Sequence, residues 1–154
     1  MEKILISACL YGKAVRYDGK DNFLAHPQLQ QWKQQGRLVV VCPEVSGGLA
    51  TPRPPAEIQA DGTILTVDGN DVTTAFNCGA EEAAVLCRQH KIKLALLKEN
   101  SPSCGSHAIY DGQFNGTKIP GEGKTTSALK LLGVKVFNES QIDELAKALT
   151  TSEY

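Results

Sequence analysis

Three cysteines, Cys9, Cys42 and Cys104, are the residues of this chain whose type and position most clearly indicate chemistry. Each one follows a short apolar run of the sequence. The three runs cover residues 3–8, 38–41 and 94–97. Continuous apolar runs of this length are typical of strands that are buried on both faces of a parallel sheet. Because the loops that leave the carboxyl ends of such strands meet at one edge of the sheet, we expect the three thiols to share one site.

The segments around these cysteines are rich in glycine and proline, as in Cys9-Leu10-Tyr11-Gly12, Cys42-Pro43-Glu44 and Ser101-Pro102-Ser103-Cys104-Gly105. Glycine permits close backbone approach. Backbone N–H groups that are free in such a loop can donate hydrogen bonds to the sulfur atoms of a bound metal centre. A cysteine at a strand end is also often a plain core residue. Three thiolates leave a metal centre incompletely ligated, which fits either zinc with an open position or a four-iron cluster with one free iron. The spacing includes neither a C-x-x-C pair nor a ferredoxin pattern, so it leaves both alternatives open.

The other two cysteines, Cys78 and Cys87, fall within residues 73–90, where the apolar residues recur at helical spacing. Cys87 lies on the same apolar face as Phe76 and Ala83, which favours core packing. We therefore exclude both residues from the site.

Helices alternate with the apolar runs, the last of which covers residues 134–137. Four segments have a helical pattern: residues 27–35, 73–90, 125–132 and a segment from about residue 140. Two further segments, 57–68 and 110–119, contain Asp-Gly or Asn-Gly turns and interrupt the alternation as short hairpin-like excursions. The sequence predicts an α/β fold in a single domain, residues 1–154, with a mainly parallel, Rossmann-like sheet flanked by helices.

Composition narrows the class of protein. Hydrophobic residues make up 42% of the 154 positions, and 16 Lys+Arg against 17 Asp+Glu give a net charge of −1. No basic excess is present to bind a large nucleic acid through its backbone, so we do not expect such a partner. The apolar N-terminal run is too short for a signal peptide, and no stretch is long enough to span a membrane. We expect a cytoplasmic protein with reduced thiols, because five irregularly spaced cysteines do not indicate a disulfide framework.

Several strings identify a relationship: ISACLYG, RYDG, VCPEVSGGLATPRPPAEI, DVTTAF, LLKENSPSCGS and IYDGQFNG. They resemble the thiouracil desulfidase family of small bacterial proteins, from Ile4 to about Phe137. The resemblance implies a 4Fe–4S cluster that is held by Cys9, Cys42 and Cys104 and leaves one iron open to the sulfur of a thiolated pyrimidine. The implied reaction is a non-redox desulfuration that gives uracil and hydrogen sulfide from a small-molecule substrate.

Four further residues are candidates for this chemistry. Glu44, two positions after Cys42, is the best placed group for proton transfer, although a solvated loop carboxylate or a partner of Arg53 is the simpler alternative. The match to the family motif favours Ser101 as a functional hydroxyl, and Ser103 is a second pocket candidate; serine in such a loop is also a common turn former. Arg53 is a candidate for binding a substrate carbonyl, for orienting Glu44 or for stabilising its own loop.

Two rival interpretations use the same residues differently. In one, the three cysteines bind zinc and Glu44 is the general base of a hydrolase. In the other, the chain is a nucleotide-binding or redox-sensing module without catalysis. The sequence has no G-x-G-x-x-G after the first strand and no complete phosphate-binding loop, although residues 121–126 (GEGKTT) resemble the end of one.

Overall fold

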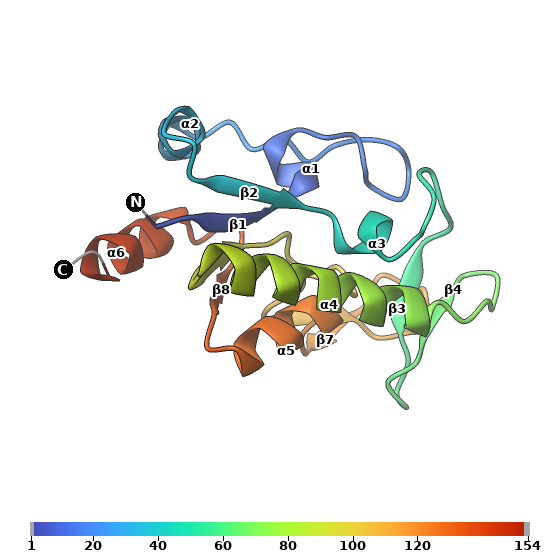
Figure 1. The fold of residues 1–154 in the computed structure, drawn as a ribbon. Helices are drawn as coiled ribbons and strands as arrows, with labels where there is room; N and C mark the ends of the chain where they lie inside the picture. Colours follow the sequence, from blue (N-terminus) through green and yellow to red (C-terminus); the bar gives the residue numbers. More distant parts are fainter. Residues whose placement is uncertain (1, 153–154) are drawn as a thin grey trace.

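The structure is a computed structural model that describes residues 2–152, and its centre is a parallel sheet of four strands in the order β2-β1-β5-β8 (Figure 1). The strands are β1 (Ile4–Ser7), β2 (Leu38–Val41), β5 (Leu94–Leu96) and β8 (Lys135–Phe137). All three pairings are parallel. The four apolar runs are thereby confirmed as strands, and the prediction of an α/β fold with a parallel sheet is confirmed with them.

Helices cover both faces of this sheet. The long ones are α2 (Pro27–Gln34), α4 (Thr73–His90), α5 (Lys124–Leu131) and α6 (Ile142–Ser152). One hydrophobic cluster joins Ile4 and Ile6 to α2 and α6, and the other joins Leu5 to α4 and α5. Successive residues of β1 therefore point into opposite clusters, which explains why its apolar run is continuous. No helix within residues 2–152 is long and apolar enough to cross a membrane.

Two one-turn helices begin where β1 and β2 end, namely α1 (Ala8–Tyr11) and α3 (Pro43–Ser46). Cys9 lies inside α1, and Cys42 is the residue that caps the N-terminus of α3. Pro43 occupies the first position of α3, where its fixed φ angle favours a helix start. The two cysteines therefore belong to short helices rather than to open loops.

Two β-hairpins lie beyond the carboxyl edge of the sheet. The first pairs β3 (Ala56–Ile58) with β4 (Ile64–Thr66), and the second pairs β6 (Ala108–Tyr110) with β7 (Lys118–Pro120). Both excursions that the turn signals indicated are confirmed. The Glu57 carboxylate in β3 accepts hydrogen bonds from the backbone N–H groups of Gly112 and Phe114 at 3.0 and 3.2 Å, so the hairpins are tied together.

Helix α3 rests directly on the backbone of α4. A Cβ atom at Gly79 in α4 would lie 1.9 Å from the carbonyl oxygen of Pro43, and one at Gly47 would lie 1.9 Å from that of Ala75. Real Cβ atoms do not approach backbone oxygens so closely. These two glycines therefore fix how near α3, with Cys42 at its start, lies to the long helix.

Gly79→Ala tests this contact. In an exposed helix the change would stabilise the protein, because alanine is the better helix former by about 1 kcal/mol. Here we expect a loss of about 1–3 kcal/mol in the free energy of unfolding, since α3 must move to admit the methyl group. Urea unfolding of the variant measures the change, with Glu82→Ala at an exposed position of α4 as the control. Equal or greater stability of Gly79→Ala would contradict the close contact.

The Glu99 carboxylate holds the loop that follows β5. It accepts hydrogen bonds from the backbone N–H groups of Asn100, Ser106 and His107 at 3.1, 2.7 and 3.1 Å, and from the Asn138 side chain at 2.7 Å. Burial alone would raise the pKa of Glu99, but the hydrogen bonds outweigh it and lower the pKa to about 2. The loop that contains Cys104 is therefore organised around one ionised carboxylate.

Glu99→Gln should remove this charge and lower the free energy of unfolding at pH 7 by about 2 kcal/mol, because hydrogen bonds to a charged group contribute about 1.5–3 kcal/mol. Because the pKa of Glu99 is lowered, its ionisation stabilises the folded state when the pH is above the ordinary pKa of 4.5. This contribution disappears as the pH falls from 4.5 towards 2. Urea unfolding between pH 7 and pH 3 should show the wild type losing its advantage over Glu99→Gln. The prediction is wrong if wild type and Glu99→Gln differ by the same free energy of unfolding at pH 7 and at pH 3. It is also wrong if the exposed control Glu82→Gln shows the same loss as Glu99→Gln.

Candidate functional site

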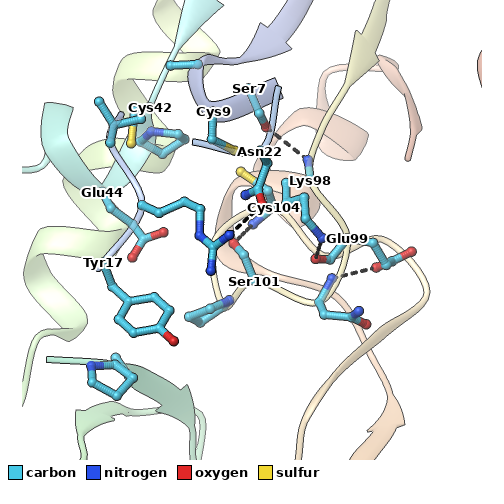
Figure 2. Close-up of a pocket in the computed structure, with 18 of the residues that line it drawn as sticks. Ser7, Cys9, Tyr17, Asn22, Cys42, Glu44, Lys98, Glu99, Ser101 and Cys104 are labelled. Carbon is cyan, nitrogen blue, oxygen red and sulfur yellow. Dashed lines mark hydrogen bonds between the residues drawn. The ribbon is translucent and has the colours of Figure 1, made fainter. Parts of the chain in front are cut away.

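A cavity of about 420 Å³ opens at the carboxyl ends of β1, β2 and β5 (Figure 2). The side chains of Cys9, Cys42 and Cys104 all line it, although 33 and 62 positions separate them along the chain. The sheet explains this convergence, since Ser7 at the end of β1 is level with Val41 at the end of β2. The connections after β1 and β5 leave in opposite directions, which is where open parallel sheets form their ligand crevice.

Cys9 and Cys42 are half-buried. Burial raises the pKa of each thiol, and the two groups also repel each other as thiolates. Hydrogen bonds act in the opposite direction: the Asn22 side chain lowers the pKa of Cys9, and the backbone N–H of Val45 lowers that of Cys42. Each thiolate thus has a hydrogen-bond donor of its own.

Cys104 is the most deeply placed of the three, with 5% of its surface exposed. Burial raises the pKa of its thiol to about 12, against hydrogen bonds from the side chains of Ser7 and Ser103. The thiol is therefore protonated at neutral pH when no metal is bound, and metal binding must release that proton.

The N-terminus of α5 hydrogen-bonds to the backbone of the Cys104 loop. The backbone N–H of Thr125 donates to the Ser103 carbonyl oxygen at 2.9 Å, and the Thr126 hydroxyl donates to the Cys104 carbonyl oxygen at 3.0 Å. A Cβ atom at Gly123 would lie 2.4 Å from the Ser103 carbonyl group. Residues 121–126, which resemble the end of a phosphate loop, therefore hydrogen-bond to the backbone of the Cys104 loop.

Glu44 lines the cavity beside Cys42, and 20% of its side chain is exposed. Burial raises the pKa of its carboxyl group, while the Arg53 guanidinium, 3.4 Å away, lowers it. The net direction is upwards. A carboxyl group with a raised pKa beside a cavity suits a role in proton transfer.

Arg53 directs most of its N–H donors to groups of the protein. Besides Glu44, it donates to the carbonyl oxygen of Ala50 at 3.1 Å, the hydroxyl of Thr51 at 3.1 Å and the carbonyl oxygen of Val15 at 3.0 Å. Its side chain is 7% exposed, although it reaches the cavity wall. Of the three roles considered for Arg53, the contacts favour orienting Glu44 and joining loops over binding a substrate carbonyl.

The two serines before Cys104 differ in position. Ser101 lines the cavity, and its hydroxyl oxygen accepts from the backbone N–H groups of Ser103 and Cys104 at 3.0 and 2.8 Å. Its own hydrogen is left to donate into the cavity. Ser103, predicted as a substrate-binding residue, is fully buried and does not line the cavity. Its hydroxyl lies 2.7 Å from that of Thr125, because the turn at Ser101 directs it towards α5.

Two further residues that line the cavity, Ser7 and Asn22, were not anticipated from the sequence, whereas Lys98 was expected at the end of the third strand. The Ser7 hydroxyl accepts from the backbone N–H of Lys98 at 3.0 Å, and the Asn22 amide oxygen accepts from Arg16 at 3.0 Å. The Lys98 ammonium reaches the cavity and pairs with Glu139 at 2.7 Å. Ser7 had one signal, a polar residue at the end of an apolar strand; Asn22 had none, because its loop has no periodic pattern.

The three thiols border one cavity. Within residues 2–152, no group of three or more His, Cys, Asp or Glu side chains has the arrangement that holds a metal ion. What the site does offer is three sulfur donors from three separate segments of the chain.

Comparisons with known proteins agree with this architecture. Residues 4–141 match the family model described as 2-thiouracil desulfurase. The chain is 38% identical over 151 residues to the uncharacterized protein YbbK of Bacillus subtilis (strain 168), which covers 92% of this chain and 99% of YbbK. It is 51% identical to the solved structure of the 4Fe–4S-dependent thiouracil desulfidase TudS, with a TM-score of 0.96 over 98% of this chain and 99% of that one. This chain belongs to the 2-thiouracil desulfurase family.

Proposed function

We propose that this chain removes sulfur from a small thiolated pyrimidine at a 4Fe–4S cluster that is held by Cys9, Cys42 and Cys104. The observation that carries the proposal is the presence of these three thiols around one cavity. Two comparisons support it: the matching family is named for 2-thiouracil, and the similar solved structure is named as a 4Fe–4S-dependent desulfidase. An iron–sulfur centre also suits the cytoplasmic location predicted from the sequence, where thiols are kept reduced.

The residues present fit such a cluster. Thiolates are the ligands that iron–sulfur clusters use, and hydrogen bonds to the cluster sulfurs tune the centre. Each cysteine here has a hydrogen-bond donor beside it. Held by Cys9, Cys42 and Cys104, the cluster would supply one iron without a cysteine ligand, a Lewis acid suited to the soft sulfur of the substrate.

The chain's own groups then account for the proton transfers. The overall reaction consumes one water, forms a C–O bond, breaks the C–S bond and releases hydrogen sulfide. Glu44 accepts the protons of the attacking water in turn at its carboxylate, which Arg53 orients, and passes them to the departing sulfur, which leaves as hydrogen sulfide. The Ser101 hydroxyl, whose oxygen is occupied by two backbone N–H groups, donates to the substrate.

The cysteine assignment predicts a clear division among variants. Cys9→Ala, Cys42→Ala and Cys104→Ala should each lose bound iron and the release of sulfide from thiouracil. Cys78→Ala, at an exposed position of α4, should keep both. Iron and acid-labile sulfide are measured on protein purified without oxygen. Wild-type protein that binds no iron after reconstitution, or that binds stoichiometric zinc in its place, would contradict the proposal.

Glu44→Gln separates catalysis from cluster binding. The amide keeps the size of the side chain but cannot take a proton, so sulfide release should fall by about 10²–10⁴-fold. The iron content and visible absorption should stay at the wild-type level, because Glu44 is not a ligand in this assignment. Single-turnover measurements under saturating thiouracil check the rate. A variant with full activity would exclude Glu44 as the base, and Glu82→Gln is the matched control on the surface of α4.

A further inference from the structure

The RYDG segment, residues 16–19, forms a tight turn after α1, and most of its residues have a structural reason to be there. The guanidinium of Arg16 pairs with Asp18 at 3.1 Å and donates to Asn22. The backbone N–H of Gly19 donates to the Arg16 carbonyl oxygen at 2.9 Å, and Gly19 has a positive φ of 79°. These contacts explain the turn, but they do not involve the Tyr17 side chain.

The backbone of Tyr17 is held firmly at the cavity. Its carbonyl oxygen accepts from the backbone N–H of Arg53 at 2.7 Å, and the neighbouring Val15 carbonyl oxygen accepts from the Arg53 guanidinium at 3.0 Å. The same guanidinium pairs with Glu44. Tyr17 therefore has a fixed position relative to the carboxyl group that we assign to proton transfer.

The ring of Tyr17, in contrast, has few partners. It lines the cavity, yet the residue is 44% exposed, and within residues 2–152 its hydroxyl has no hydrogen-bond partner. The Arg16 guanidinium lies 6.0 Å from the centroid of the ring. Figure 2 shows the ring beside Glu44, with its hydroxyl end pointing away from the Glu44 carboxyl group. An aromatic face is thus left available next to the reacting groups.

The other aromatic residues nearby do not offer the same surface. Tyr110 also lines the cavity and, like Tyr17, has a cation near its ring, the Lys118 ammonium at 5.8 Å from the centroid, but Tyr110 is half-buried. Phe23, on the same loop as Tyr17, is 52% exposed and does not line the cavity. Of these aromatic residues, Tyr17 is the one that lines the cavity, has an exposed ring and has its backbone fixed by Arg53.

We propose that the Tyr17 ring is the surface on which the planar ring of the thiolated pyrimidine stacks. This inference rests on the proposed function and adds a substrate-binding residue to it. A pyrimidine is flat and polarisable, and offset stacking on an aromatic ring fixes its plane without using its polar edges. Those edges stay free for Ser101 and for the reacting carbon. Because the Tyr17 backbone is already fixed, stacking orders little more than the ring itself.

The test compares Tyr17→Ala and Tyr17→Phe in enzyme loaded with iron. Removing a stacked ring should raise KM for thiouracil, and the inhibition constant of the product uracil, by about tenfold. Tyr17→Phe keeps the ring and should retain both constants to within about twofold, with kcat little changed in either variant. Iron content should equal that of the wild type. Phe23→Ala is the matched control, an exposed aromatic residue of the same loop outside the cavity.

Four outcomes would overturn the inference: unchanged constants in Tyr17→Ala, an equal loss in Tyr17→Phe, an equal loss in Phe23→Ala, or a loss of iron in Tyr17→Ala. The second would assign the role to the hydroxyl, the third would indicate a general effect of the loop, and the fourth would make Tyr17 a support of the cluster. Failure of the proposed function is seen separately, as wild-type enzyme that releases no sulfide from thiouracil.

Discussion

The parallel pairing of β1 with both β2 and β5 is the constraint on which the rest of the molecule depends. It brings three strand ends to one edge of the sheet, and each of the three following segments contributes one cysteine. The Ser7 hydroxyl joins two of these ends, because it accepts from the backbone of Lys98 and lies against the Cys104 thiol. A shift of either pairing by one residue would turn the buried side chains of β1 to the wrong faces and separate the thiols.

Gathering three thiols in a partly closed cavity is unfavourable for the charged form that a metal requires. Burial raises the pKa of every one of them, most of all that of Cys104. The fold offsets this by fixing the donors and the loops before any metal arrives, through Glu99 on one side of the Cys104 loop and the start of α5 on the other. A site that is already organised binds its centre with less loss of conformational entropy.

Much of this arrangement could be predicted from the sequence, and the reason is periodicity. Continuous apolar runs identified the strands, helical spacing identified α4, and the rule for strand ends brought Cys9 and Cys42 together. What the sequence could not provide depends on contacts between distant segments. Ser103 faces α5 because Ser101 binds two backbone N–H groups and turns the loop, and no local pattern reveals such a turn. Likewise, a glycine within a helix gives no indication that another backbone rests on it.

Arg53 shows how the separate parts of the site are coupled. Its guanidinium holds the Glu44 carboxylate, while its backbone N–H and another guanidinium nitrogen hold Tyr17 and Val15. One residue therefore sets the distance between the carboxyl group proposed for proton transfer and the loop that carries Tyr17. A cation that served only as a counter-ion for Glu44 would not need backbone contacts to a second loop. The low exposure of the Arg53 side chain, 7%, follows from this position between two segments.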